Sequence, residues 1–506
     1  MAGVEDVGQE LNEIPSPQLY TREGYAGGDP AASQRPFRSP ASGRGDNCER
    51  QSINPAIIGG GYAGMAAAVT LAEHGISVTV FESAKQLGGR ARGVPHSIQR
   101  LHADNELTPP FQLPPGGRKS NRNNLMLDNG QHILLGCYRE TLRLIQQVGG
   151  NIENDFLRLP LQLTLHNCFE LKAPCLPAPL HLLVGLLTAR GLSFAQRLSA
   201  TRFMLAMRSI GFVLPHDMTV FDLLRAHNQN DELIRLLWEP ICIAALNTPA
   251  HKASAQVLLH VLRDSLNGAR ADSDMLLPRL NFSALFPERA AEYVKQRGGE
   301  VLTSCGVEAI IANEEGIEVC TARGAMRFTH IICAASPANA AHLLRDVPQL
   351  APVAAQVEAL AFQPIYTVYL QYPATVRLPQ PMLGFDRCFM QWLFDKGQIA
   401  AQHGLIAAVI SAEGLHQELE HEQLAQKVAQ ELNEQLGIME APLWHRVIAE
   451  KRATFSCEPN LPRPVHTTPL ASILLAGDYT AGNYPATLEG AVMSGIRCAK
   501  EIVNIV

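Results

Sequence analysis

The sequence predicts an α/β protein built on a doubly wound parallel sheet, with a second, discontinuous α+β domain. Residues 55–58 form a short apolar run, a glycine-rich turn and a helix of small residues follow, and a second apolar strand occupies 77–82. This is a complete β–α–β unit within about 30 residues. Later apolar runs at 331–335 and 473–478 are candidates for the same sheet, whereas 151–300 are richer in helical periodicity.

Composition narrows the class of protein. A length of 506 residues predicts two to four domains. Hydrophobic residues make up 46% of the chain and charged residues 18%, a composition that indicates a folded globular protein. A net charge of −6 argues against binding to nucleic acid, which needs clustered lysine and arginine. The 11 cysteines include no C-x-x-C pair, so neither a zinc ribbon nor a disulfide scaffold is indicated. We expect a reducing, cytoplasmic environment, since no signal peptide and no apolar run of about 20 residues is found.

Two segments stand apart from the folded body. Residues 1–52 contain five prolines and seven glycines but few large apolar residues, so we expect a disordered extension. Residues of about 99–124 are rich in Pro, Gly, Asn and Lys and predict a loop insertion. The rest is predicted to divide into a dinucleotide-binding domain (53–150, 280–340 and 465–506) and a substrate domain (151–279 and 341–464).

The glycine-rich turn carries a dinucleotide-binding pattern. In Gly59-x-Gly61-x-x-Gly64, the first glycine permits a tight turn, the second lets backbone approach a pyrophosphate, and the third allows close packing of helix on strand. Glu82 ends the second strand, where an acidic side chain binds a ribose hydroxyl. The pattern therefore predicts a Rossmann-like domain for FAD or NAD, in preference to NADP.

A second glycine pair separates these two cofactors. Leu87-Gly88-Gly89-Arg90 follows the ribose acid closely and resembles the GG-doublet (GR2-type) flavoprotein superfamily of amine oxidases and phytoene desaturases. In that superfamily an aspartate near the C-terminus binds the ribityl chain, and the next helix points its N-terminus at the flavin. The resemblance implies that FAD is the cofactor and that these further residues contact it: Gly88, Gly89, Arg90, Gln131, Val307, Gly477, Asp478, Thr487 and Leu488.

Several longer motifs resemble one branch of this superfamily. They are LDNGQH at 127–132, the segments 237–248, 276–279, 367–372 and 391–395, EKRATF at 450–455 and AGDYT at 476–480. Over roughly 55–503 the chain resembles the squalene-associated FAD-dependent desaturases, the hydroxysqualene dehydroxylases of hopanoid biosynthesis. The resemblance implies that hydroxysqualene loses its hydroxyl, gains a hydride from reduced FAD and becomes squalene. Such a substrate needs a long apolar tunnel and a proton donor for the departing hydroxyl.

Two residues are predicted as that general acid. His132 follows Gly130-Gln131, where the superfamily's chain passes the flavin ring. Glu239 lies between Trp238 and Pro240 in an otherwise apolar helix. Asp264 is a further candidate, although the preceding Arg263 favours an ion-paired structural role.

Other functions and partners stay open at this point. A carotenoid or phytoene-type desaturase would run the flavin in the oxidative direction, a flavin amine oxidase would need an aromatic cage, and a flavin-bound lipid carrier would show no turnover. The electron donor is unknown, because no second dinucleotide motif is present. Leu176–Leu187 is too short to span a membrane but is a candidate for peripheral membrane contact, or for a wall of the substrate site.

Overall fold

A computed structural model describes residues 53–97, 124–313 and 316–505. The predicted extension at 1–52 lies entirely outside these residues, and so does nearly all of the predicted insertion. The described residues form one compact unit. Within the described part of the chain, no helix combines the length and the apolar character needed to cross a bilayer.

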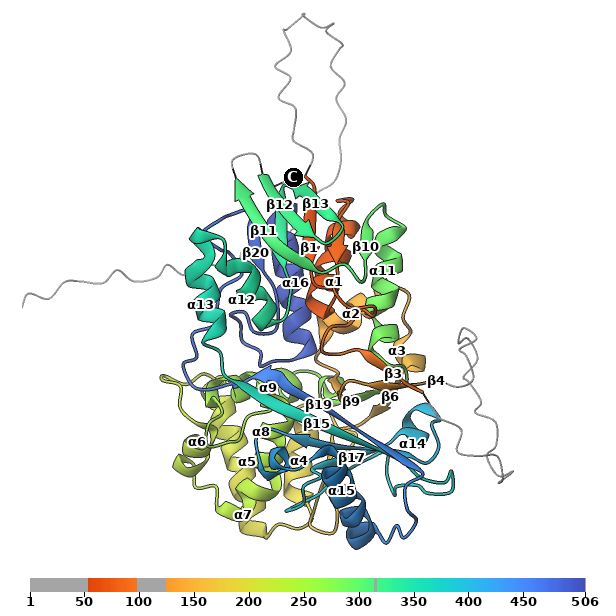
Figure 1. The fold of residues 1–506 in the computed structure, drawn as a ribbon. Coiled ribbons are helices and arrows are strands. Elements are labelled where there is room, and N and C mark those ends of the chain that lie inside the picture. The colour runs from red at the N-terminus through yellow and green to blue at the C-terminus, as the bar shows by residue number, and fades with distance from the viewer. Residues whose placement is uncertain (1–52, 98–123, 314–315, 506) are drawn as a thin grey trace, which may run out of the picture. The chain divides into compact units, whose positions relative to one another are not determined.

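A five-stranded sheet forms the centre of one half of the unit (Figure 1). Its strands pair in parallel throughout, as the alternation of strands and helices along the chain predicts. The prediction of a parallel α/β domain is thus confirmed. In spatial order the strands are β10 (Glu300–Leu302), β2 (Thr79–Phe81), β1 (Pro55–Ile58), β14 (His330–Cys333) and β20 (Ile473–Leu475).

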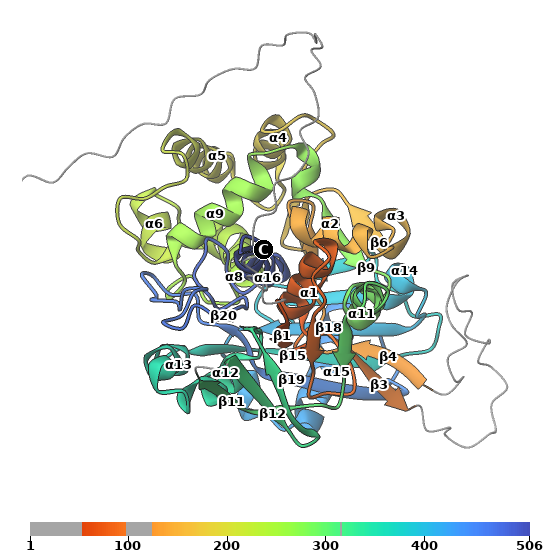
Figure 2. The same cartoon turned by 90° about the horizontal axis from the view of Figure 1, so that it is seen from above.

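Helix α1 (Tyr62–Glu73) is buried along almost its whole length, between α16 (Leu488–Val503) and α11 (Pro287–Lys295) (Figure 2). The small side chains of α1 allow this close packing, and two glycines mark the points where the backbones come closest. A Cβ on Gly64 would lie 1.9 Å from the carbonyl oxygen of Gly59, and a Cβ on Gly495 would lie 2.0 Å from that of Ala63. Larger residues at these positions would push α1 away from β1 and α16.

Smaller elements surround this sheet. They are the antiparallel sheet of β11 (Val307–Asn313), β12 (Gly316–Thr321) and β13 (Gly324–Phe328), the hairpin-like pair β3 (Gly93–Ser97) and β4 (Asn124–Asp128), the sheet of β5 (Leu134–Leu135), β9 (Met275–Pro278) and β6 (Phe156–Leu159), and helices α2 (Arg139–Gln147), α3 (Ile152–Asp155), α10 (Phe282–Leu285), α12 (Pro337–Arg345) and α13 (Ala351–Glu358).

The other half is built on a seven-stranded mixed sheet. In order its strands are β19 (Trp444–Phe455), β15 (Phe362–Gln371), β18 (Leu405–Ser411), β17 (Trp392–Asp395), β16 (Met382–Gly384), β7 (Gln162–Leu165) and β8 (Phe169–Lys172). The helices of this half are α4 (Leu180–Thr188), α5 (Phe194–Ser209), α6 (Val220–Ala226), α7 (Asp231–Leu233), α8 (Glu239–Leu246), α9 (Ala255–Leu266), α14 (Lys396–Ala400) and α15 (His421–Leu436).

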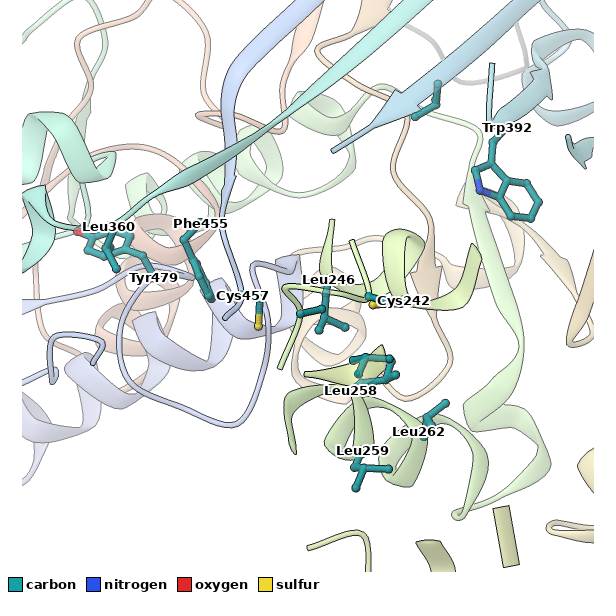
Figure 3. Packing of buried hydrophobic residues seen from close by; sticks show 14 of the residues in the cluster. Cys242, Leu246, Leu258, Leu259, Leu262, Leu360, Trp392, Phe455, Cys457 and Tyr479 are labelled. Carbon is teal, nitrogen blue, oxygen red and sulfur yellow. The ribbon is translucent and has the colours of Figure 1, made fainter. Parts of the chain in front are cut away.

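The apolar helix that the sequence predicts around Glu239 is interrupted. Residues Ile234–Trp238 form a π-helical turn, and α8 begins at Glu239 with Pro240 in its first turn. Proline lacks the N–H that a continuous α-helix would require here, so the bonding pattern changes just before it. Beyond the turn, Cys242 and Leu246 on α8 pack near Leu258 and Leu262 of α9 in one buried cluster (Figure 3).

Candidate functional site

One large cavity, of about 890 Å³, joins the two halves of the unit. On one side it is bounded by the loops that follow β1, β2, β14 and β20. These are the carboxyl ends of parallel strands, where open α/β sheets bind their ligands. On the other side its wall is largely apolar, formed by residues that include Leu163, Leu171, Leu182, Met204, Trp238 and Trp392.

The glycines at the strand ends form a cradle open to the cavity. Gly59 has a φ of +112°, and a Cβ there would lie 2.5 Å from the carbonyl oxygen of Ala334. A Cβ on Gly61, the N-cap of α1, would instead have no protein atom closer than 3.8 Å and would fill cavity space. The N–H of Gly88 donates to the carbonyl of Gly60 at 2.9 Å, which places the second glycine motif beside the first. These positions fit a bound pyrophosphate at a helix N-terminus.

Glu82 stands at the end of β2, on the cavity wall. Its carboxylate accepts hydrogen bonds from the backbone N–H groups of Gly60 at 2.7 Å and Ala84 at 2.8 Å. Those bonds fix the carboxylate in position while leaving lone pairs for a ribose hydroxyl.

Val307, at the start of β11, lies on the same wall. Gly64 does not line the cavity but packs α1 against the turn, the role expected of the third glycine.

Arg90 and Asp478 both line the cavity and form a salt bridge with each other. This salt bridge joins an N-terminal and a C-terminal part of the described chain. The Arg90 guanidinium also donates to the carbonyl of Ala453 at 2.6 Å. Nearby, Thr487 caps α16 by accepting from the N–H of Gly490 at 3.1 Å. The cavity lining includes Gly477, Asp478, Thr487 and Leu488, so the positive end of the α16 dipole faces the same space.

The LDNGQH segment contributes Gln131 and His132 to the cavity lining. Behind them is a buried group that sequence reasoning missed. The ammonium of Lys396 donates to the side-chain Oε1 of Gln131 at 3.1 Å and lies 3.8 Å from the carboxylate of Asp128. Burial raises the pKa of Asp128 to about 6, opposed by Lys396 and by the N–H of Phe282, while burial lowers the pKa of Lys396. Lys396 directly follows β17. Its only signal in the sequence is that it comes straight after the segment 391–395.

The two predicted proton donors are placed differently. His132 lines the cavity and contacts Phe282 edge-on, with ring centroids 5.0 Å apart. Burial and the positive charge of Arg90 lower the pKa of His132 to about 4, so its ring is uncharged at neutral pH. A neutral imidazole is a weaker acid than an imidazolium, which limits the proton it can supply.

Glu239 does not line the cavity, although Trp238 and Pro240 on either side of it do. Its carboxylate accepts from the N–H of Ala250 at 3.3 Å, and burial raises its pKa. A general acid must lie within hydrogen-bond reach of the proton's destination. The position of Glu239 therefore gives the predicted catalytic role no support.

The Gly61 cradle yields a test of cofactor binding. Gly61→Val should lose most of its bound FAD because the side chain fills cavity space, while the apoprotein should keep its melting temperature because no protein atom is displaced. Flavin absorbance after gel filtration and thermal unfolding measure the two effects. Gly482→Val is the matched control, since a Cβ there meets only the end of Arg463 at 3.8 Å and should leave FAD bound. Full FAD occupancy in Gly61→Val would refute the cradle.

The depressed pKa of His132 predicts how stability depends on pH. Above pH 6.5 the ring is neutral in both the folded and the unfolded protein, but between 6.5 and about 4 only the unfolded chain gains a proton. Folding stability is therefore lost as the pH falls, by about 3 kcal/mol at most from this group. Denaturant unfolding at pH 7 and pH 4 should show a smaller loss for His132→Gln than for the parent. Parallel losses in both proteins would show that His132 titrates normally.

Comparisons with known proteins agree with this architecture. The chain is 25% identical over 456 residues to the hydroxysqualene dehydroxylase of Sinorhizobium fredii, covering 88% of this chain and 97% of the relative. It is 26% identical over 467 residues to the enzyme of the same name from Rhodopseudomonas palustris, covering 88% and 96%. A zeta-carotene desaturase of Zea mays is 22% identical over 89% of this chain and 83% of its own length.

Solved structures show the same fold. Cyclohexylamine oxidase from Brevibacterium oxydans superposes with a TM-score of 0.62 and 17% identity, covering 90% of this chain and 99% of the other. A putrescine oxidase variant superposes with a TM-score of 0.64 and 15% identity, covering 90% and 99%. The family of flavin containing amine oxidoreductases matches residues 62–503, nearly the whole described unit. The chain is therefore a member of that family, an oxidoreductase whose cofactor is FAD.

Proposed function

We propose that this chain converts hydroxysqualene to squalene by reductive dehydroxylation. The observation that carries the proposal is that one cavity has both the glycine cradle and a largely apolar wall in its lining. A C30 isoprenoid chain needs an apolar environment of this kind, since each CH₂ transferred out of water contributes about 0.8 kcal/mol. The named relatives that align over nearly their full length add support.

The reaction balances as an allylic alcohol, a hydride and a proton giving a hydrocarbon and water. FAD, when reduced, supplies the hydride to carbon. The chain's own residues bind and enclose the reactants: the apolar wall orients the isoprenoid, and burial excludes water from the carbon that loses its hydroxyl. With His132 uncharged and Glu239 off the cavity, we expect the proton to come from another group or from ordered water.

The proposal is tested by a single turnover without oxygen. FAD-loaded protein is reduced chemically and mixed with hydroxysqualene, and the extract is examined for squalene while flavin absorbance is followed. We expect flavin reoxidation together with one squalene per flavin. Oxidised protein mixed with a carotenoid precursor serves as the contrasting arm. Flavin reduction there, without squalene formation in the first arm, would replace the proposal with the desaturase alternative.

We also propose that the surface of α4 and α5 contacts a lipid bilayer, from which the substrate would enter. The predicted contact segment, Leu176–Leu187, supports this only in part. Leu182 and Leu186 are 6% and 2% exposed and line the cavity, so that face of α4 is a wall of the substrate site. Leu180 and Leu187 are 52% and 39% exposed on the same short helix.

Helix α5 packs against α4, and the two helices lie side by side (Figure 2). Phe194 and Leu205 are 72% and 47% exposed and lie 11 residues apart, which is three helical turns, so they share one face of α5. The exposed Arg202 lies one turn before Leu205 and would suit anionic headgroups. We call the α4–α5 apolar surface the set of four exposed residues Leu180, Leu187, Phe194 and Leu205.

Replacing Leu180, Leu187 and Phe194 together by serine should weaken co-sedimentation with liposomes containing anionic lipid by about tenfold or more. Burial of side chains of this size contributes about 1.5–3 kcal/mol each, so even partial burial gives this effect. Bound FAD should be unchanged. The matched control replaces three exposed apolar residues outside α4 and α5, Leu415, Met439 and Val465, by serine. Equal binding by both triple variants would rule out the α4–α5 apolar surface as the contact.

A further inference from the structure

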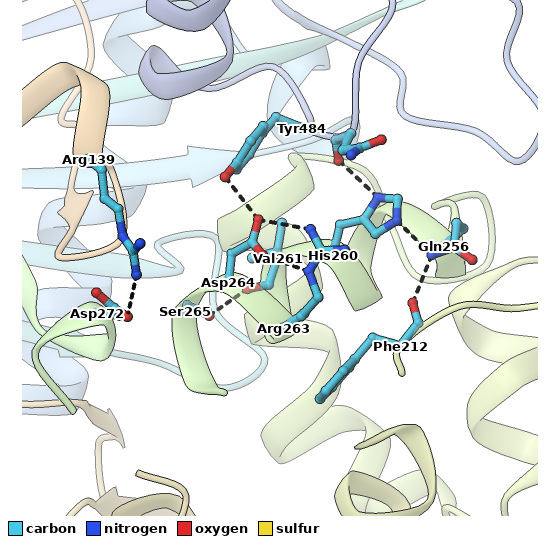
Figure 4. Close-up of polar contacts among 11 residues, drawn as sticks. Arg139, Phe212, Gln256, His260, Val261, Arg263, Asp264, Ser265, Asp272 and Tyr484 are labelled. Carbon is cyan, nitrogen blue, oxygen red and sulfur yellow. Dashed lines mark hydrogen bonds and ion pairs between the residues drawn. The ribbon is translucent and has the colours of Figure 1, made fainter. Parts of the chain in front are cut away.

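Helix α9 carries a polar group that faces the cavity. Asp264 and Tyr484 both line the cavity, and the Tyr484 hydroxyl donates to Oδ2 of Asp264 at 2.9 Å (Figure 4). Around them the same wall includes Val261, Leu262 and Leu266. In a largely apolar cavity, the few polar groups that face the ligand fix its orientation and provide specificity.

The position of the pair is fixed by contacts on both sides. His260, one turn before Asp264 on α9, contacts the carbonyl of Asn483 at 3.3 Å, so the helix is joined twice to the loop that precedes α16. Arg463 holds the same loop by donating to the carbonyl of Tyr484 at 2.8 Å. Because Tyr484 lies three residues before Thr487, the pair stands where the apolar wall meets the dinucleotide motifs.

The Asp264 carboxylate retains capacity for another donor. Nε of Arg263 donates to Oδ1 at 2.7 Å, and Nη2 of Arg263 donates to Oδ2 at 3.3 Å, in addition to the bond from Tyr484. A carboxylate has about four lone-pair sites, so three donors leave about one for a ligand. Burial and the charge of Asp264 raise the pKa of Tyr484, so its phenol stays protonated and keeps donating to Asp264.

Another polar side chain on this wall is already used. The amide of Asn247 donates to the carbonyl of Pro364 at 3.2 Å and to Thr454 Oγ1 at 2.9 Å, and its oxygen accepts from the N–H of Ala412 at 2.8 Å. Asn247 therefore maintains the wall, whereas the carboxylate of Asp264 faces the cavity with an acceptor site to spare.

We propose that Asp264 and Tyr484 form a subsite that binds the hydroxyl group of an isoprenoid alcohol inside the apolar cavity. The ligand's O–H donates to the Asp264 carboxylate, and Tyr484 holds that carboxylate in place. The inference rests on the proposed function, because it assigns the polar end of the same substrate. It also explains how one cavity distinguishes the alcohol from the hydrocarbon that remains after dehydroxylation.

The test compares the binding of hydroxysqualene and squalene to FAD-loaded, oxidised protein without a reductant, so that neither ligand is consumed. Bound ligand is extracted and quantified after gel filtration in detergent. Partition into micelles affects parent and variants equally, so the ratio of the two affinities is the readout. The parent should prefer the alcohol by roughly ten- to hundredfold, the range expected for a hydrogen bond to a charged group.

Asp264→Asn should remove most of this preference while leaving squalene affinity and flavin content unchanged. Tyr484→Phe keeps the ring and should reduce the preference by a smaller factor, which also tests the subsite if Asp264→Asn does not fold. The matched control is Asp272→Asn, a carboxylate that pairs with Arg139 at 3.1 Å and does not line the cavity (Figure 4). It should leave the preference intact.

An unchanged preference in Asp264→Asn and Tyr484→Phe, with both ligands bound, would overturn the subsite alone. Loss of flavin in Asp264→Asn with an unchanged preference would also overturn it, by assigning the pair to the cofactor. Failure of the parent to bind either ligand would overturn the proposed function together with the subsite.

Discussion

The close approach of α1 to its neighbours is the constraint on which the cofactor half depends. Gly64 brings the helix onto the turn after β1, and Gly495 brings α16 onto α1, each leaving no room for a Cβ. Through these two contacts α1 packs both on the turn that follows β1 and against α16. The N-termini of both helices then face the same cavity, although they lie more than 400 residues apart in the sequence.

Charged side chains that are buried near this cavity are paired with groups of opposite charge. Arg90 pairs with Asp478, and Lys396 lies near Asp128 with Gln131 as a further acceptor. Isolated charges would be too costly in such surroundings, so each is held beside an opposite charge or a dipole. Lys396 in turn positions Gln131 on the cavity wall, and a segment that touches the cofactor space is thereby fixed from behind.

The cavity combines two environments that a single surface could not offer. One end includes glycine backbone, helix N-termini and charged groups, whereas the wall at the other end is largely apolar and includes leucine, methionine and tryptophan side chains. Helix α4 contributes to this apolar wall and to the protein surface. Leu182 and Leu186 face the cavity, and Leu180 and Leu187 on the same helix face solvent. One short apolar helix therefore serves as a wall of the site and as an exposed apolar surface.

The sequence by itself determined the elements whose signals are local. The strand–glycine–helix order, with the acidic Glu82 at the end of the second strand, predicted a parallel sheet that binds a dinucleotide, because a tight turn and a close backbone approach need glycine at short spacing. The glycine pair at 88–89 indicated FAD through its resemblance to the GG-doublet flavoproteins. Only the tertiary structure decided which distant side chains meet. Asp264 and Tyr484 are 220 residues apart, and Lys396 and Gln131 are 265 apart. It likewise separated His132, on the cavity, from Glu239, off it, because which face of an apolar helix is covered depends on the packing of the other elements.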